Sequence, residues 1–70
     1  GTVEQNKKLR QAVGQTDPGR SLAALAALVR TAPDFAEAYN QRAIVHYRRG
    51  EFARGVADCE AVLRLNPHHF

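Results

Sequence analysis

Apolar residues recur at helical spacing along the chain. In the second quarter they fall at i, i+3, i+6 and i+7, which places them on one side of a helix: Leu22, Leu25, Leu28 and Val29. A second stripe in the last third has the same character: Phe52, Val56, Cys59, Val62 and Leu63. Alanines fill many of the intervening positions, and small residues allow helices to approach closely. The pattern predicts close-packed helices.

Start and stop signals divide the chain into four predicted helices. Thr2 with Gln5 three residues later resembles a capping box, and Asp17-Pro18 supplies an N-cap followed by proline at the first helical position. Asp34, with Glu37 three residues on, is the predicted cap of the third helix. The fourth runs from about Phe52 to Leu65, and Asn66-Pro67 resembles one more helix start. Gly50 is expected to adopt a positive φ between the third and fourth helices.

The sequence also repeats weakly at an offset of 34 residues. The shift pairs identical or similar residues, including Asn6 with Asn40, Ala27 with Ala61, Pro33 with Pro67, Leu22 with Val56, and Val29 with Leu63. A period of this length is typical of stacked helix-turn-helix units, each too thin to bury its own apolar face. Short connections make consecutive helices antiparallel neighbours.

The second unit resembles the tetratricopeptide repeat. The residues that carry the resemblance are Tyr39, Ala43, Tyr47, Gly50, Phe52, Gly55 and Pro67. His46 stands where the family usually has Tyr, Gly55 and Val62 where it favours Ala, and Arg42 where Leu is common. Arg42 can pack its stem while its head reaches solvent.

The resemblance implies an all-α fold of two stacked antiparallel helical hairpins, a four-helix fragment of an α-solenoid. The expected division is a degenerate hairpin at 1–33, a repeat hairpin at 34–67, and the truncated start of a next helix at 68–70. Tyr39 and Phe52 are expected to be buried packing residues. The short chain and its abrupt end suggest a piece of a longer protein.

The family's usual role implies a protein–protein interaction module that binds a protein or peptide. The first helix of each hairpin would line a concave surface, and the expected contact residues are Glu37, Asn40, Gln41, Ile44 and Arg48. Asn40 and Gln41 would bond a peptide backbone, and Arg48 would pair with a carboxylate, so the partner could be acidic. The alternative from a different class is a self-associating structural element, a homodimer through uncapped repeat ends at Val62, Leu65 and Phe70. A chaperone-tail clamp fits less well, because it needs Asn where Gln41 stands.

Composition favours a binding module over an enzyme. Seventy residues with a net charge of +3 allow one small domain, and the charges of both signs are interspersed, which disfavours nucleic-acid binding. No nucleophile motif or glycine-rich phosphate loop occurs, and we expect no cofactor. His46, His68 and His69 do not have the spacing of a zinc site, and the single cysteine, Cys59, is expected to be a small buried residue. No apolar run approaches the ~20 residues that span a bilayer, and nothing assigns a compartment beyond a cytoplasmic default.

Overall fold

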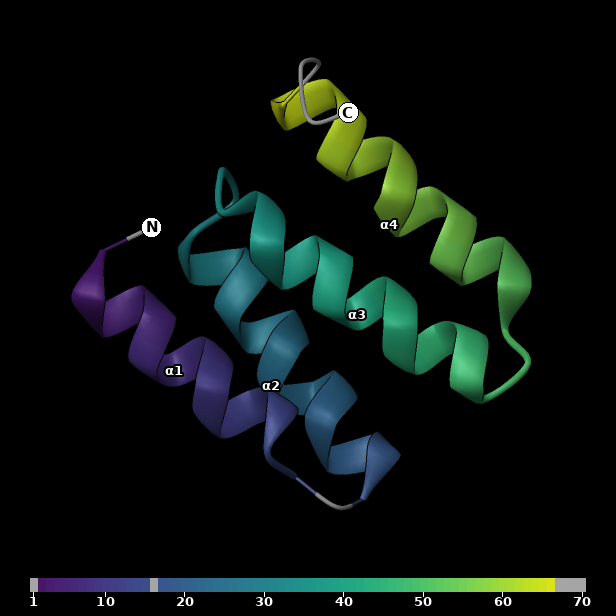
Figure 1. The fold of residues 1–70 in the computed structure, drawn as a ribbon, viewed down its shortest axis with the longest axis horizontal. Coiled ribbons are helices and arrows are strands. Elements are labelled where there is room, and N and C mark those ends of the chain that lie inside the picture. Colours follow the sequence, from purple (N-terminus) through teal and green to yellow (C-terminus); the bar gives the residue numbers. More distant parts are fainter. Residues whose placement is uncertain (1, 16, 67–70) are drawn as a thin grey trace.

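The computed structural model describes residues 2–15 and 17–66, and in this part of the chain four α-helices form the fold (Figure 1). Their bounds are Val3–Val13 for α1, Pro18–Thr31 for α2, Ala36–Arg48 for α3 and Phe52–Leu65 for α4. The all-α prediction is therefore confirmed over the described residues. The predicted helix start at 68–70 lies outside them.

Local capping explains where the first two helices begin. The Gln5 amide donates to Thr2 Oγ1 at 3.1 Å, and the Thr2 amide donates to Gln5 Oε1 at 3.1 Å. These reciprocal bonds satisfy two amides that the first helical turn leaves without partners. At α2, the Asp17 carboxylate accepts from the Gly19 amide at 3.0 Å, and Pro18 takes the first helical position. Both predicted caps are confirmed.

The predicted cap at Asp34 is wrong. Helix α3 begins one residue later than a cap at Asp34 requires, because Phe35 occupies the N-cap position, and no side chain bonds to this helix end. Phe35 is buried in the core, and its amide donates to the Ala32 carbonyl at 3.0 Å. Burial of this ring, which the sequence pattern did not single out, decides where the helix starts.

The turn between α3 and α4 depends on Gly50. Its φ is +76°, the one positive value among the described residues, and the prediction at this position is confirmed. Its amide donates to the Tyr47 carbonyl, and the Glu51 amide donates to the His46 carbonyl at 2.8 Å. These bonds satisfy carbonyls at the end of α3 and reverse the chain into α4.

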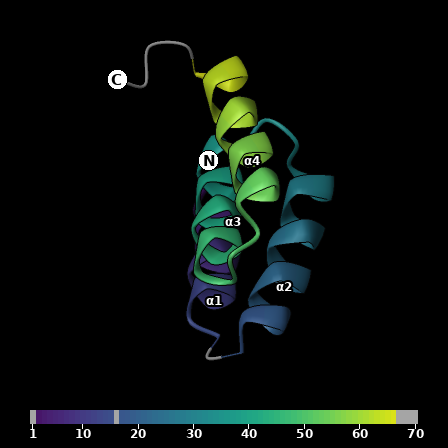
Figure 2. The ribbon, with the colours of Figure 1, turned by 90° about the vertical axis from the view of Figure 1, so that its right-hand side faces the viewer.

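Each helix packs against the next one along the chain, and neighbours run antiparallel (Figure 1). In the view of Figure 2, α1 and α3 lie one behind the other, with α2 to one side of both. This places the first helices of the two hairpins in a common layer. That layer carries the predicted contact residues.

The apolar core lies between α1, α2 and α3. Its buried members are Leu9, Ala12, Leu25, Leu28, Val29, Ala32, Phe35 and Ala38. Tyr39 is half-buried against this core, and its hydroxyl donates to the Pro33 carbonyl at 3.0 Å, so its packing role is confirmed. Phe52 is 63% exposed, with its ring centroid 6.1 Å from that of Tyr47, so its predicted burial is wrong. No helix in 2–15 or 17–66 covers that side of α4.

Candidate interaction surface

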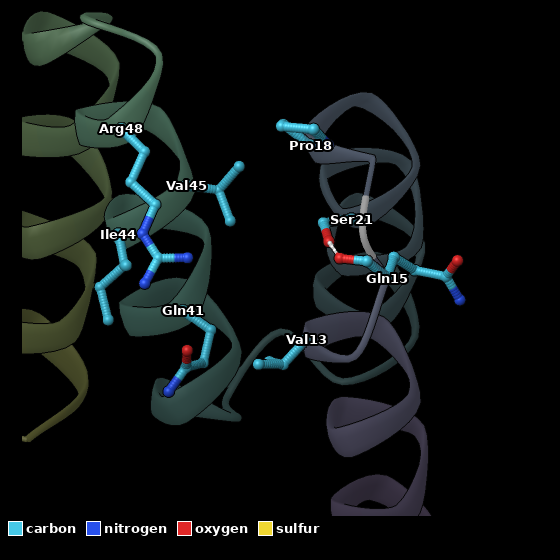
Figure 3. A pocket seen from close by; sticks show the side chains of 8 residues that line it. All are labelled: Val13, Gln15, Pro18, Ser21, Gln41, Ile44, Val45 and Arg48. Carbon is cyan, nitrogen blue, oxygen red and sulfur yellow. Dashed lines mark hydrogen bonds between the residues drawn. The ribbon is translucent and has the colours of Figure 1, made fainter.

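A hollow of about 160 Å³ separates α3 from the junction of α1 and α2 (Figure 3). We call it the interaction hollow. Its lining residues are Val13, Gln15, Pro18 and Ser21 on one side and Gln41, Ile44, Val45 and Arg48 on α3. It lies in the layer formed by α1 and α3, where the family resemblance places the contact surface.

Ser21 fixes the far wall of the interaction hollow. Its hydroxyl donates to the Ala12 carbonyl at 2.9 Å, with a longer contact of 3.4 Å to the Gln15 carbonyl, which is drawn in Figure 3. The side chain is buried, so these bonds replace hydration that it lost on folding. They hold the start of α2 against the end of α1.

The interaction hollow combines apolar contact with one positive charge. Val13, Ile44 and Val45 supply apolar surface, and Arg48 is exposed at the last turn of α3. The Gln41 side-chain amide donates to Glu37 Oε1 at 3.0 Å, one helical turn away, which orients it along α3. Such a surface can hold an apolar side chain and pair an adjacent carboxylate with a guanidinium.

The five predicted contact residues all lie on α3, but they do not share one hollow. Gln41, Ile44 and Arg48 line the interaction hollow. Glu37 and Asn40 line a second one, of about 360 Å³, with Asp34 and Phe35 before α3 and Val62, Leu65 and Asn66 at the end of α4. The residues that complete the interaction hollow from the junction of α1 and α2, such as Val13 and Gln15, were not predicted.

A polar cluster joins α3 to α4. Asp58 is buried and accepts two hydrogen bonds from Arg42, from Nε at 2.9 Å and from Nη2 at 2.7 Å. This fork-to-carboxylate geometry is the strongest arrangement available to an ion pair. The bonds to Asp58 raise the pKa of Arg42 above its usual value, although partial burial acts in the opposite direction. The Arg42 side chain remains 24% exposed, and the partner of its head, Asp58, was not predicted.

His46 links this ion pair to the α3–α4 turn. It is buried, with Nδ1 3.0 Å from Glu51 Oε1 and Nε2 3.7 Å from Asp58 Oδ2. The hydrogen bond from His46 lowers the pKa of Glu51, and the positive charges of Arg49 and Arg54 lower it further. His46 is thus a structural histidine, as expected.

Gly55 and Cys59 bring α4 against Tyr47. A Cβ at Gly55 would lie 2.7 Å from Tyr47 Cε1, which explains glycine at a helical position where the family favours alanine. Cys59 is only half-buried, although it was predicted to be buried. Its Sγ lies 3.6 Å from the Tyr47 hydroxyl. That contact raises the pKa of Tyr47.

Other site types find no support in the described residues. Within 2–15 and 17–66, no group of three or more His, Cys, Asp or Glu side chains could hold a metal ion. None of the helices described there has the length and apolar character needed to cross a membrane.

The architecture and the hollow define a class of protein: a helical-hairpin repeat scaffold. The model of the tetratricopeptide repeat family matches residues 36–69, which span α3 and α4. The match covers just under half of the chain and supports its assignment to the tetratricopeptide repeat family. Repeats of this family generally serve as protein–protein interaction modules.

A curated relative supports the same assignment. The chain is 40% identical over 38 residues to a TPR repeat-containing protein of Rhizobium etli. The match covers 54% of this chain and 19% of the relative, so the chain spans about a fifth of that protein. No solved structure matches the chain significantly.

Proposed function

We propose that the chain is a protein–protein interaction module that binds an extended peptide in the interaction hollow. The observation that carries this proposal is that Gln41, Ile44 and Arg48 of α3 line one hollow together with the junction of α1 and α2. An apolar peptide side chain would pack between Val13 and Ile44. Its neighbouring carboxylate, from an acidic residue or a chain terminus, would pair with Arg48. The peptide would thus be acidic.

We also propose a division into two repeats. Residues 1–33 would be a degenerate hairpin that serves as one wall of the interaction hollow, and 34–67 a repeat hairpin that serves as the other. The placement of α1 and α3 in one layer supports this division (Figure 2). Glu37 and Asn40, which line the second hollow, would contact a peptide that continues along α3.

A peptide array tests the proposal. The probe is an array of eight-residue peptides in which acidic and neutral sequences are matched for apolar content. The wild-type chain should bind acidic peptides preferentially. Arg48→Gln should remove that preference, and Ile44→Glu should weaken binding to all peptides.

Arg64→Gln is the matched control, since Arg64 is also an exposed arginine at the last turn of its helix but lies outside the interaction hollow. It should leave binding unchanged. Equal losses with Arg48→Gln and Arg64→Gln would show a general charge effect and would refute a site at the interaction hollow.

A further inference from the structure

The outward face of α4 carries a continuous apolar stripe. Its members are Phe52, Val56, Cys59 and Leu63, which we call the α4 stripe. Phe52, Val56 and Leu63 are 63%, 47% and 39% exposed, and Cys59 is half-buried. Exposed apolar residues are ordinary when scattered, but a contiguous row on one helix face indicates a contact surface.

The internal repeat shows that this face is built to be covered. The 34-residue offset relates Val56, Cys59 and Leu63 to three residues of α2: Leu22, Leu25 and Val29. In α2, Leu25 and Val29 are buried in the core that α3 completes. In α4, Cys59 contacts the Tyr47 hydroxyl of α3, but no further helix among residues 2–15 and 17–66 covers these positions. The stripe is therefore the counterpart of a surface that this molecule buries elsewhere.

The opposite edge of the molecule does not match the stripe. The face of α3 that packs toward α2 includes Ala38, Tyr39 and Val45. The 34-residue offset relates these to Glu4, Gln5 and Gln11 of α1, which are all polar. Lys8 pairs with Glu4 on the same side, 4.0 Å apart and exposed to solvent. Head-to-tail stacking of α1 of one copy on α4 of another would bury these groups against apolar side chains at a cost.

The apolar surface that matches the α4 stripe is the same stripe on a second copy of the chain. The four residues are spaced by four, three and four positions, the alternation of the a and d sites of a coiled-coil heptad. With two such stripes antiparallel about a twofold axis, Phe52 faces Leu63 of the other copy, and Val56 faces Cys59. No charged residue belongs to the stripe, so the pairing buries no unpaired charge.

We infer that α4 is a homodimerisation surface, through which two copies of this chain associate antiparallel and isologously. Four side chains per copy make a contact smaller than the ~800 Å² per partner of a standard interface. The dimer is therefore dependent on concentration and not obligate. The α4 stripe shares no residue with the interaction hollow, so this inference stands or falls independently of the proposed function.

Sedimentation equilibrium of the full chain, under reducing conditions and over a wide concentration range, tests the inference. The wild-type chain should pass from monomer to dimer and no further. Leu63→Glu should weaken dimerisation about tenfold or more. The matched control is Leu65→Glu, since Leu65 is 40% exposed on the same helix but lies outside the stripe; it should dimerise like the wild type.

Circular dichroism at the lowest concentration checks that Leu63→Glu keeps its helices. If it does not, Phe52→Lys, at the first position of α4, replaces it in the comparison. An equimolar mixture of Phe52→Lys and Leu63→Glu chains should form heterodimers more strongly than either variant forms homodimers, because the antiparallel register places Lys opposite Glu.

Three results would overturn the inference. A wild-type chain that remains monomeric throughout would show that the stripe accepts another partner, such as a further helix of a longer polypeptide. Open-ended oligomers would indicate head-to-tail contacts. Equal effects of Leu63→Glu and Leu65→Glu would show that the stripe is not the interface.

Discussion

The two junctions that flank α3 solve the same packing problem with different side chains. Toward α2, the contact is made by apolar groups, with Leu25 fully enclosed beside Ala38 and Phe35. Outside the apolar core, the buried positions of α3 and α4 are mostly small or polar: Ala43 and His46 on α3, and Gly55, Asp58 and Ala61 on α4, with Val62 as the larger apolar exception. Of the three residues predicted at a free edge, Val62 is buried, which contradicts the prediction, Leu65 is 40% exposed, and Phe70 lies outside the described residues. One side of α3 thus joins the first hairpin through apolar contacts, and the other joins α4 within the second hairpin mainly through small and polar groups.

The difference has a physical consequence. Apolar packing is non-directional and tolerates substitutions that preserve volume. The fork of Arg42 on Asp58 is directional, and it holds α4 at one position along α3. We therefore expect the α2–α3 junction to contribute most of the free energy of folding. The α3–α4 junction should fix more strictly how far the two helices are shifted along each other.

The largest expected effect separates two positions that the repeat makes equivalent. Leu25→Ala should destabilise the fold by about 2–5 kcal/mol, because Leu25 is fully buried. Cys59→Ala, 34 residues later, should cost about 1 kcal/mol or less, since Cys59 is only half-buried. Urea denaturation followed by circular dichroism measures both. Equal losses would mean that burial by a following helix does not determine the cost of truncation at these two equivalent positions.

Next in size is the loss of the buried carboxylate. Asp58→Ala should destabilise by about 1.5–3 kcal/mol, because Arg42 would keep its charge without its partner. The double variant Arg42→Met with Asp58→Leu should be more stable than Asp58→Ala, since it removes both charges and restores apolar contact. Thermal denaturation of the variants compares them. A double variant that is the least stable would argue for a net stabilising ion pair.

Substitutions in the turn between α3 and α4 should change the stability by smaller amounts. Gly50→Val should cost about 1–2 kcal/mol, because a branched side chain disfavours a φ of +76°. Arg49→Ala, the neighbouring control, removes an exposed contact to Glu51 and should cost about 0.5 kcal/mol or less. Equal melting temperatures of the two variants would contradict a strained position at Gly50.

Acid should weaken the α3–α4 junction slightly through Glu51. Its pKa is lowered in the folded chain from an ordinary value of 4.5, so folding favours its ionised form. That stabilisation is complete above the ordinary pKa and is lost as pH falls from there through the lowered folded pKa. Glu51→Gln should therefore lose less stability than the wild type between about pH 6 and about pH 3.

Melting temperatures across this range measure the effect at Glu51. Glu60→Gln, an exposed glutamate on the same helical hairpin, is the control and should follow the wild type. Identical acid responses of the Glu51 and Glu60 variants would show that the contact with His46 does not favour the charged carboxylate.

The sequence predicted the helices well where their ends depend on local chemistry. Thr2 and Asp17 each bond to an amide two or three residues away, so a short window contains the whole signal. The prediction of an N-cap at Asp34 was wrong because the start of α3 depends on burial of Phe35, a tertiary effect. The predicted burial of Phe52 was wrong for a related reason, since its exposure depends on which helices surround α4.

The candidate surface was predicted only in part. That Glu37, Gln41 and Arg48 share a helix follows from their spacing. Their distribution between two hollows depends on Val13 at the end of α1 and Gln15 in the turn after it, and their contact with α3 forms only when the hairpins pack together. The pair of Arg42 and Asp58 was also missed, because residues 16 positions apart meet only after α4 folds onto α3.

The order in which the helices pack has a consequence for how the chain folds. Each helix packs against its immediate neighbour along the chain, so most contacts join residues that are close in sequence. Proteins with such local contacts fold within microseconds to milliseconds, since little loop entropy is lost before contacts form. Under tension applied to its two ends, the same arrangement should come apart helix by helix, starting at the edges.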